Sequence, residues 1–444
     1  MRFDAVVIGS GLCGTLAARQ LEQAGQRVLV LEAGPGAPKQ LPGDVVGFQR
    51  AVAPLTKIDA LAWGFRAPRD YEWHRVRARG GRTLVWGGWM ERPPADYFAM
   101  RRKLGAPWPQ AFDGLAPWLA RAETMLSVRG GRPGALHRTL RRHGVEAGVK
   151  RESVLLGQRR MLTAVDLPLR AKVRCETTVL RLEPDGDGWV VHLAKGAAVK
   201  ARRVVLAASP IETARIVEAS VAPAQRRTKL EVFDHLIAGA IAIADRQEVT
   251  PHPKTAAEPS AVVHPAPGAK ARFSLEVRGP TPLEALDEED LAALGFTKAQ
   301  ALEHSFYVVF AMGETDPRVP RQVLLDEAHL DGLGRPMPRF VKRRHTPYEA
   351  ALAAKMNARV LGLGRKLATS SKQAFLIYDA TDFSSGGHEV GTCLGRVDDR
   401  GEVTTLPGVF IVDGSGVPAA TDRHPSLTLA ANTLRIVSGL CARA

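Results

Sequence analysis

The chain has 444 residues, a formal net charge of +15 and 45% hydrophobic residues, which is ordinary for a soluble globular protein apart from the charge. We find no run of about 18 consecutive apolar residues, so we expect no membrane span, and four scattered cysteines exclude a disulfide scaffold. The Arg-rich segment 129–160 lacks interleaved aromatic residues that stack on bases, so we expect no nucleic acid; a solvated basic surface is preferred, with an acidic substrate or carrier protein as the alternative.

The N-terminal region predicts a βαβ unit. Phe3–Ile8 is an apolar strand, Leu12–Ala24 has helical spacing, and Arg27–Glu32 is a second strand typical of a parallel sheet. The chain enters the first strand almost at once and shows no signal peptide, so we expect a cytoplasmic protein.

The turn of this unit contains the pattern GxGxxG. Gly9 permits the tight turn, Gly11 lets a pyrophosphate approach the backbone, and Gly14 lets helix and strand pack closely. Glu32 ends the second strand, where its carboxylate can accept hydrogen bonds from a ribose diol and would repel a 2′-phosphate. The motif predicts a dinucleotide site but does not separate FAD from NAD.

Further elements follow in chain order. Gly80–Gly88 is a glycine-rich loop, and Trp108–Val128 predicts a helix with a lead-in rich in proline and tryptophan. The stretch from Val173 to Val191 alternates like paired strands, Val204–Ala208 is a buried strand, and Ile211–Ala219 is a helix.

The C-terminal half predicts a second lobe and a return to the first. Short strands in 236–345 indicate a sheet-based lobe, followed by a helix at Ala350–Leu367. Val409–Val412 is a strand and Leu427–Gly439 a helix. Between them Gly414–Ala419 fits GxGxxA, but too few residues follow for another βαβ unit, so we interpret it as a loop touching the first cofactor.

These motifs together resemble the glucose–methanol–choline (GMC) oxidoreductase family. The stretches that carry the resemblance are Gly9–Gly14 with Leu31–Gly34, Gly80–Gly88, Ala207–Thr213, His388–Cys393, and Asp413–Ser415 with His424 and Pro425. The segments Trp108–Glu123 and Asp331–Arg339 are also similar to its sugar-oxidising, pyranose oxidase-like branch. Trp86 departs from the pattern, because many relatives carry a small or amide residue there.

The resemblance implies an α/β fold (α+β overall). It consists of a Rossmann-type FAD-binding domain and a second, sheet-based substrate domain. We expect the discontinuous FAD-binding domain to comprise 1–95, 165–235 and 385–444. The substrate domain would comprise 96–164, with the helical and Arg-rich insertion, and 236–384.

The expected cofactor is noncovalent FAD, because the second glycine-rich loop offers Val85 and no histidine for a covalent link. Thr178 and Val179 are expected on an exposed strand edge, where they could contact the adenine. The predicted cofactor-binding residues are Gly9, Gly11, Leu12, Cys13, Gly14, Glu32, Ala33, Gly81, Arg82, Thr83, Val85, Trp86, Gly87, Gly88, Thr178, Val179, Ala208, Ser209, Thr213, Asp413, Gly414, Pro425 and Ser426.

The implied reaction is hydride removal from the CH–OH carbon of an alcohol, a sugar or a natural-product hydroxyl. The hydroxyl proton must leave first, and histidine suits this role because its pKa lies near neutral pH. By resemblance His388 is the preferred base and His424 stabilises the developing charge, although the two could be reversed. Structural roles are the alternatives for both, and for His235 a structural role is preferred.

Several alternatives stay open. Glu212 is preferred as a simple acid at a helix N-terminus, and Trp89 is equally a core residue or a wall of the pocket. The chain could be a non-redox lyase of the same family or a flavin-binding protein without catalysis. We expect no metal, an electron acceptor that is oxygen, quinone or protein, and a monomer or homodimer.

Overall fold

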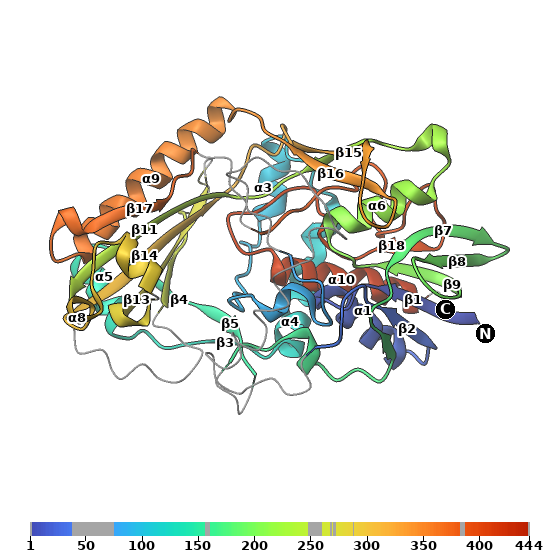
Figure 1. Cartoon of the computed structure of the whole chain (residues 1–444), viewed down its shortest axis with the longest axis horizontal. Coiled ribbons are helices and arrows are strands. Elements are labelled where there is room, and N and C mark those ends of the chain that lie inside the picture. Colours follow the sequence, from blue (N-terminus) through green and yellow to red (C-terminus); the bar gives the residue numbers. More distant parts are fainter. Residues whose placement is uncertain are drawn as a thin grey trace.

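The structure, a computed structural model, describes residues 2–37, 75–155, 160–246, 260–266, 269, 272–286, 288–381 and 387–442. Residues 38–74 of the predicted FAD-binding domain lie outside this part. The described chain forms two lobes (Figure 1). One contains a mainly parallel sheet and both termini, and the other contains a large antiparallel sheet covered by a long helix.

The first sheet is the core of the nucleotide-binding lobe, and its strand order is β6-β2-β1-β9-β8-β7, with β18 also pairing to β9. Val6 of β1 lies opposite Leu29 and Val204 in parallel register, which confirms the predicted βαβ opening. The strands are β1 (Arg2–Ile8), β2 (Val28–Leu31), β6 (Lys172–Arg174), β7 (Val179–Asp185), β8 (Gly188–Leu193), β9 (Val199–Leu206) and β18 (Val409–Ile411).

Both faces of this sheet are covered, which is why its strands are nearly continuous apolar runs. Helices α1 (Leu12–Gln23) and α10 (Ser426–Cys441) pack on the face that carries Val7. Helix α6 (Pro210–Ser220) and a small antiparallel sheet pack on the other face. That small sheet has the order β10-β15-β16, with bounds β10 (Lys229–Val232), β15 (Arg321–Leu330) and β16 (Pro336–Val341).

The large antiparallel sheet of the second lobe has the order β17-β11-β14-β13-β12-β4. Helix α9 (Pro347–Leu367) lies on one face, where alternate positions of β11 from Ala238 to Ala244 are alanine and let the helix approach closely. The strands are β4 (Gly148–Val149), β11 (Leu236–Asp245), β12 (Ser260–Val263), β13 (Phe273–Pro282), β14 (His304–Gly313) and β17 (Ala374–Tyr378).

The opposite face of this sheet is divided. Helices α7 (Glu288–Ala293) and α8 (Lys298–Ala301) cover its outer half, where Ile241, Ile243 and Phe306 are buried. The inner half, which carries Glu276 and Phe310, faces the nucleotide-binding lobe across a cavity.

The segment between the lobes differs from one prediction. In place of a single helix at Trp108–Val128, a 3₁₀ turn at Gln110–Leu115 precedes α4 (Ala116–Met125). Pro117 accounts for the later start, because proline is favoured in the first turn of a helix. Helix α4 packs against α10. The other elements here are α3 (Tyr97–Lys103), α5 (Ala135–Arg142), β3 (Val128–Gly130) and β5 (Arg151–Ser153).

The predicted domain boundaries remain a prediction. Residues 321–341, assigned to the substrate domain, place Val323 and Phe340 in the core of the nucleotide-binding lobe. Among the described helices, none is long and apolar enough to cross a membrane. All four cysteines are unpaired.

Candidate active site

A cavity of about 870 Å³ extends from the first βα turn to the inner half of the large sheet. Cofactor clefts are typically about 300–1,000 Å³ in volume. Of the predicted cofactor residues, those on the cavity wall are Gly9, Gly11, Leu12, Cys13, Glu32, Ala33, Gly81, Arg82, Thr83, Val85, Trp86, Gly87, Gly88, Thr178, Val179, Ala208, Ser209, Asp413, Gly414, Pro425 and Ser426.

The glycines of the first turn fit a dinucleotide pyrophosphate. Gly9 has φ +100°, and a Cβ on Gly14 would lie 2.0 Å from the Gly9 carbonyl oxygen, so both positions require glycine. A Cβ on Gly11, in contrast, would point into open space, with no atom of the described residues beyond its chain neighbours and its own helix within 4 Å. Gly11 is the N-cap of α1, whose backbone N–H groups and dipole favour an anion. Gly14 packs behind the cavity wall.

Glu32 lies where a ribose-binding acid is expected, at the end of β2. One carboxylate oxygen accepts from Ser10 Oγ at 2.6 Å and the other from Gly34 N at 2.8 Å. Burial raises the pKa of Glu32, while these hydrogen bonds oppose the shift. The network orients the carboxylate along the cavity wall.

Thr178 and Val179 line the cavity, but the prediction that they are exposed is wrong. Only 7% of Thr178 and 3% of Val179 is exposed, although β7 is the last strand of its sheet. Arg77 covers this position and donates from Nη2 to Thr178 Oγ1 at 3.1 Å. Sequence analysis did not identify Arg77, which precedes the glycine-rich loop.

The second glycine turn is a loop against the first cofactor site, as interpreted from the sequence. Asp413 accepts from Ser415 N at 2.9 Å and from Thr213 Oγ1 at 2.7 Å. Burial raises the pKa of Asp413, and these bonds partly oppose the rise. Gly414 lies on the cavity wall and Thr213 behind it, so Thr213 holds Asp413 in place.

The two predicted catalytic histidines meet at the end of the cavity nearest the large sheet. His388 Nε2 lies 3.4 Å from His424 Nδ1, and the ring centroids are 5.0 Å apart at 80°. Both rings line the cavity. His424 immediately precedes Pro425, the N-cap of α10, so the helix start fixes its position.

His424 is held by two side chains from other elements. Its Nε2 makes a short contact with Glu276 of β13, and Trp89 stacks on its ring at 5.3 Å and 22°. Burial would raise the pKa of Glu276, but the neighbouring His424, together with Arg278 and Lys150, lowers it to about 2. Glu276 is therefore a carboxylate at neutral pH.

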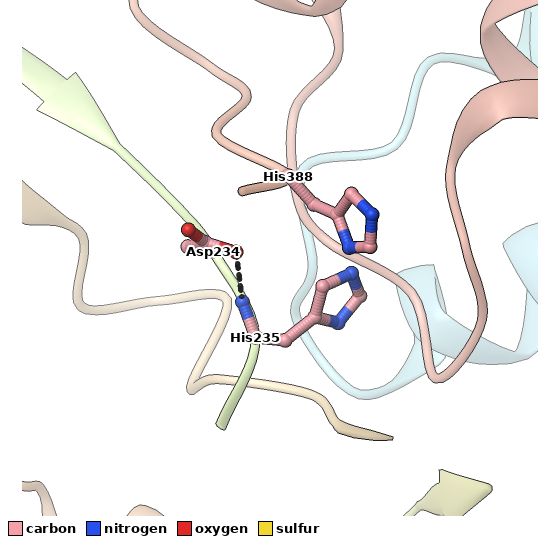
Figure 2. Close-up of side chains that lie close together, drawn as sticks. All are labelled: Asp234, His235 and His388. Atoms are coloured by element: carbon pink, nitrogen blue, oxygen red, sulfur yellow. Dashed lines mark hydrogen bonds between the residues drawn. The ribbon is translucent and has the colours of Figure 1, made fainter. Parts of the chain in front are cut away.

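The His388 segment is held by Arg82 of the glycine-rich loop, and its ring packs against His235. Arg82 donates to Glu389 at 2.7 Å and also to the Gly387 carbonyl, which ties the glycine-rich loop to the His388 segment. His235 packs edge-on against His388 with centroids 5.0 Å apart. Figure 2 shows the two rings side by side, and Asp234 accepts a hydrogen bond from the backbone N–H of His235.

His235 is fully buried, and burial lowers its pKa to about 3, so the ring is neutral. The ligand atoms of Asp234, His235 and His388 lie within 4.8 Å of one another, the one such trio found in the described part of the chain. The structural role of His235 and the lack of a metal both stay predictions.

Glu212 does more than favour the helix dipole. It forms ion pairs with Arg75 at 2.8 Å and with Arg215 and Arg335 at 3.0 Å. Burial would raise the pKa of Glu212, but these arginines lower it to about 2. The cluster joins α6 to the hairpin after β15 at the cofactor end of the cavity.

Sequence analysis missed the side chains on the large sheet. Alternation along β13 places Glu276 and Arg278 on the same face, but this pattern does not show which face borders the cavity. Other cavity-lining residues of this sheet are Ile237, Phe310, Ala311, Met312 and Tyr378.

Comparison with known proteins supports the fold. A family model described as an NAD(P)-binding Rossmann-like domain matches residues 7–38. No curated protein is similar enough in sequence to match the chain. A crystal structure of pyridoxine 4-oxidase from Mesorbium loti is similar, with a TM-score of 0.67, 18% identity and coverage of 98% of each chain. The chain thus has the fold of this oxidase, a mixed α/β fold with a Rossmann-like nucleotide-binding domain, as predicted from the sequence.

Proposed function

We propose that the chain is an FAD-dependent oxidoreductase that removes a hydride from the CH–OH carbon of an alcohol. The observation that carries this proposal is the pair His388 and His424, with ring nitrogens 3.4 Å apart on the wall of the cavity that also contains the dinucleotide turn. Nucleotide binding alone needs neither imidazole. The similar structure is named an oxidase of the alcohol pyridoxine, which supports the same class of reaction.

The residues on the wall suit noncovalent FAD. The N-terminus of α1 at Gly11 would hold the pyrophosphate, Glu32 the ribose, and Thr178 the adenine region. Val85 and Trp86 would border the flavin. FAD, when bound, supplies the acceptor for the hydride, so that an alcohol whose hydroxyl proton has passed to the protein leaves as the carbonyl compound.

The histidines supply the proton transfer. We propose that His388 accepts the hydroxyl proton and that His424 Nδ1 contacts the same oxygen, because Nε2 of His424 is occupied by Glu276. Glu276 and the stacked Trp89 hold the His424 ring, so the carboxylate balances the charge of a protonated ring. The electron acceptor, the oligomeric state and the cytoplasmic location stay predictions.

Anaerobic flavin reduction tests the proposal. The purified yellow protein is mixed with alcohols, sugars and glycosides, and we expect loss of flavin absorbance with at least one of them. Admitting oxygen then separates an oxidase from a dehydrogenase. A colourless protein that binds NAD and no flavin would contradict the cofactor, and substrate turnover without flavin reduction would indicate the lyase.

The variant His388→Ala tests the base. We expect it to retain FAD and to reduce it about 10²- to 10⁴-fold more slowly, because a general base typically contributes that much. His192→Ala is the control, since His192 is a half-buried residue of β8 that pairs with Glu183 and does not line the cavity. Full turnover by His388→Ala with bound FAD rejects the assignment.

A further inference from the structure

Arg278 is a cation on the cavity wall with a weak protein partner. It lies on β13 two residues from Glu276, and 32% of its side chain is exposed. Its Nη2 is 3.4 Å from Glu276 Oε2, beyond the roughly 2.7–2.9 Å of a charge-assisted hydrogen bond. The other oxygen of Glu276 contacts His424, so this carboxylate is already engaged.

Three other arginines of the cavity wall have closer carboxylate partners. Arg75 and Arg82 lie 2.8 and 2.7 Å from carboxylate oxygens, and Arg335 has two such contacts, at 3.0 and 2.9 Å. These three arginines build the cofactor end. Arg278 lies at the other end, where none of the described residues places a carboxylate comparably close to its charge.

The surroundings of Arg278 are aromatic and contain hydrogen-bond donors without acceptors. Its guanidinium carbon lies 5.6 Å from the Trp89 ring centroid and 5.5 Å from that of Phe310. The buried Nε of Arg278 and the buried indole Nε1 of Trp89 have no acceptor among the described residues. Buried donors of this kind are normally satisfied, so a ligand with acceptor oxygens fits here.

We propose that the alcohol substrate carries a carboxylate and that Arg278 binds it, with the apolar body of the substrate against Trp89 and Phe310. The inference rests on the proposed function. A planar guanidinium matches the two oxygens of a carboxylate. Arg278 and His424 both contact Glu276, so a hydroxyl at His424 and a carboxylate at Arg278 can belong to one small molecule. An acidic substrate is also one of the explanations left open for the charge of +15.

Matched alcohols test the inference in the holoenzyme. The probes are 4-(hydroxymethyl)benzoate, its methyl ester and benzyl alcohol, which share the reacting CH–OH group and differ in charge. We expect kcat/KM for flavin reduction to be about tenfold to a hundredfold higher for the carboxylate, as for one charge-assisted contact. Added salt should reduce this preference and leave benzyl alcohol unchanged.

The variant Arg278→Gln should abolish the preference, so that the ratio of kcat/KM for the carboxylate to kcat/KM for its methyl ester falls to about one. Arg278→Lys keeps the charge but loses the planar fork, so an intermediate preference is expected. Lys150→Gln is the control: Lys150 lies 4.6 Å from the Trp89 ring but pairs with Glu152 and does not line the cavity, so the preference should remain. FAD content and thermal unfolding establish that each variant is folded.

Two kinetic results would overturn the inference. One is that wild type has the same kcat/KM for the carboxylate and for its ester. The other is that Arg278→Gln lowers kcat/KM for both by the same factor, which would mean that Arg278 acts through Glu276. If no probe reduces the flavin, these alcohols fail as substrates, and equilibrium binding decides. Benzoate should then bind the oxidised holoenzyme at least tenfold more tightly than benzamide, and lose this advantage in Arg278→Gln; equal binding refutes the inference.

Discussion

The two ends of the cavity are built from different parts of the chain. At the cofactor end, backbone groups of glycine turns form the wall, and Gly81 approaches so closely that its Cβ would lie 3.2 Å from Gly11 Cα. At the sheet end, side chains of Glu276, Arg278 and Phe310 form the wall, on strands joined by long excursions. One end recognises a ligand by close approach of the main chain, and the other by side-chain chemistry.

This difference predicts how each end responds to substitution. A site formed by main-chain groups loses its ligand when an added side chain fills the space, so its glycines cannot be replaced by larger residues. A side-chain site fails through lost charge or hydrogen bonding, while the backbone beneath it stays intact. The following variants test whether the two ends separate in this way.

The largest effect is expected at the cofactor end, in the pair Gly14→Ala and Gly11→Ala. Gly14→Ala should destabilise the apoprotein by about 1–3 kcal/mol or more, because its Cβ overlaps the Gly9 carbonyl. Gly11→Ala should leave the apoprotein within about 0.5 kcal/mol of wild type. The variant should nevertheless bind FAD about tenfold to a hundredfold more weakly, since the added methyl group enters the space of the ligand. Thermal unfolding and FAD titration measure both, and wild-type FAD affinity in Gly11→Ala would contradict the placement of the pyrophosphate.

An intermediate effect is expected at the sheet end, in Glu276→Gln. The amide preserves shape but removes the charge beside His424, so we expect flavin reduction to slow about a hundredfold with FAD content unchanged. Because the pKa of Glu276 is lowered to about 2, the carboxylate is ionised throughout pH 5–9, and the loss should be similar across that range. Stopped-flow reduction measures it, with Glu276→Asp as the variant that keeps the charge. Wild-type rates in Glu276→Gln would remove Glu276 from the mechanism.

The smallest effect concerns His235, behind the catalytic pair. Its folded pKa is about 3 against an ordinary value of 6.5, so below pH 6.5 the unfolded chain gains a proton that the folded chain does not. Stability therefore falls as the pH drops from 6.5 towards 3, by about 2 kcal/mol between pH 8 and pH 5. His235→Phe should remove this part of the slope in urea unfolding. The difference in stability between the variant and wild type at pH 8 measures the effect of the substitution on packing alone. If stability depends on pH equally in both proteins, His235 is not buried in a neutral form.

The contrast also explains what could be predicted from the sequence. The roles of Gly9, Gly11 and Glu32 follow from contacts within one βαβ unit, so their spacing is visible in the chain. Placing His388 and His424 on one cavity wall required the family resemblance, because 36 residues separate them. Their meeting depends on the start of α10 and on the Arg82–Glu389 pair.

Other parts of the site could not be predicted because they depend on tertiary packing. Glu276 and Arg278 alternate with core residues of β13, and only the packing of α9 on the opposite face shows that they border the cavity. Thr178 was predicted to be exposed, since nothing in its neighbourhood indicates that Arg77 covers it. The helix predicted at Trp108–Val128 was too long. The pattern of apolar residues did not show that the α-helix begins only at Ala116, with Pro117 in its first turn.

The alternation along the large sheet separates two tasks within the same strands. Leu275, Val277 and Val309 belong to the core that the sheet shares with α9, and the intervening positions Glu276, Arg278 and Phe310 face the cavity. A lineage of such proteins can therefore exchange the ligand-facing set without rebuilding the scaffold, and so acquire new substrates by few mutations. A combinatorial library at 237, 278, 310 and 312, with Glu276 retained, would explore that space directly.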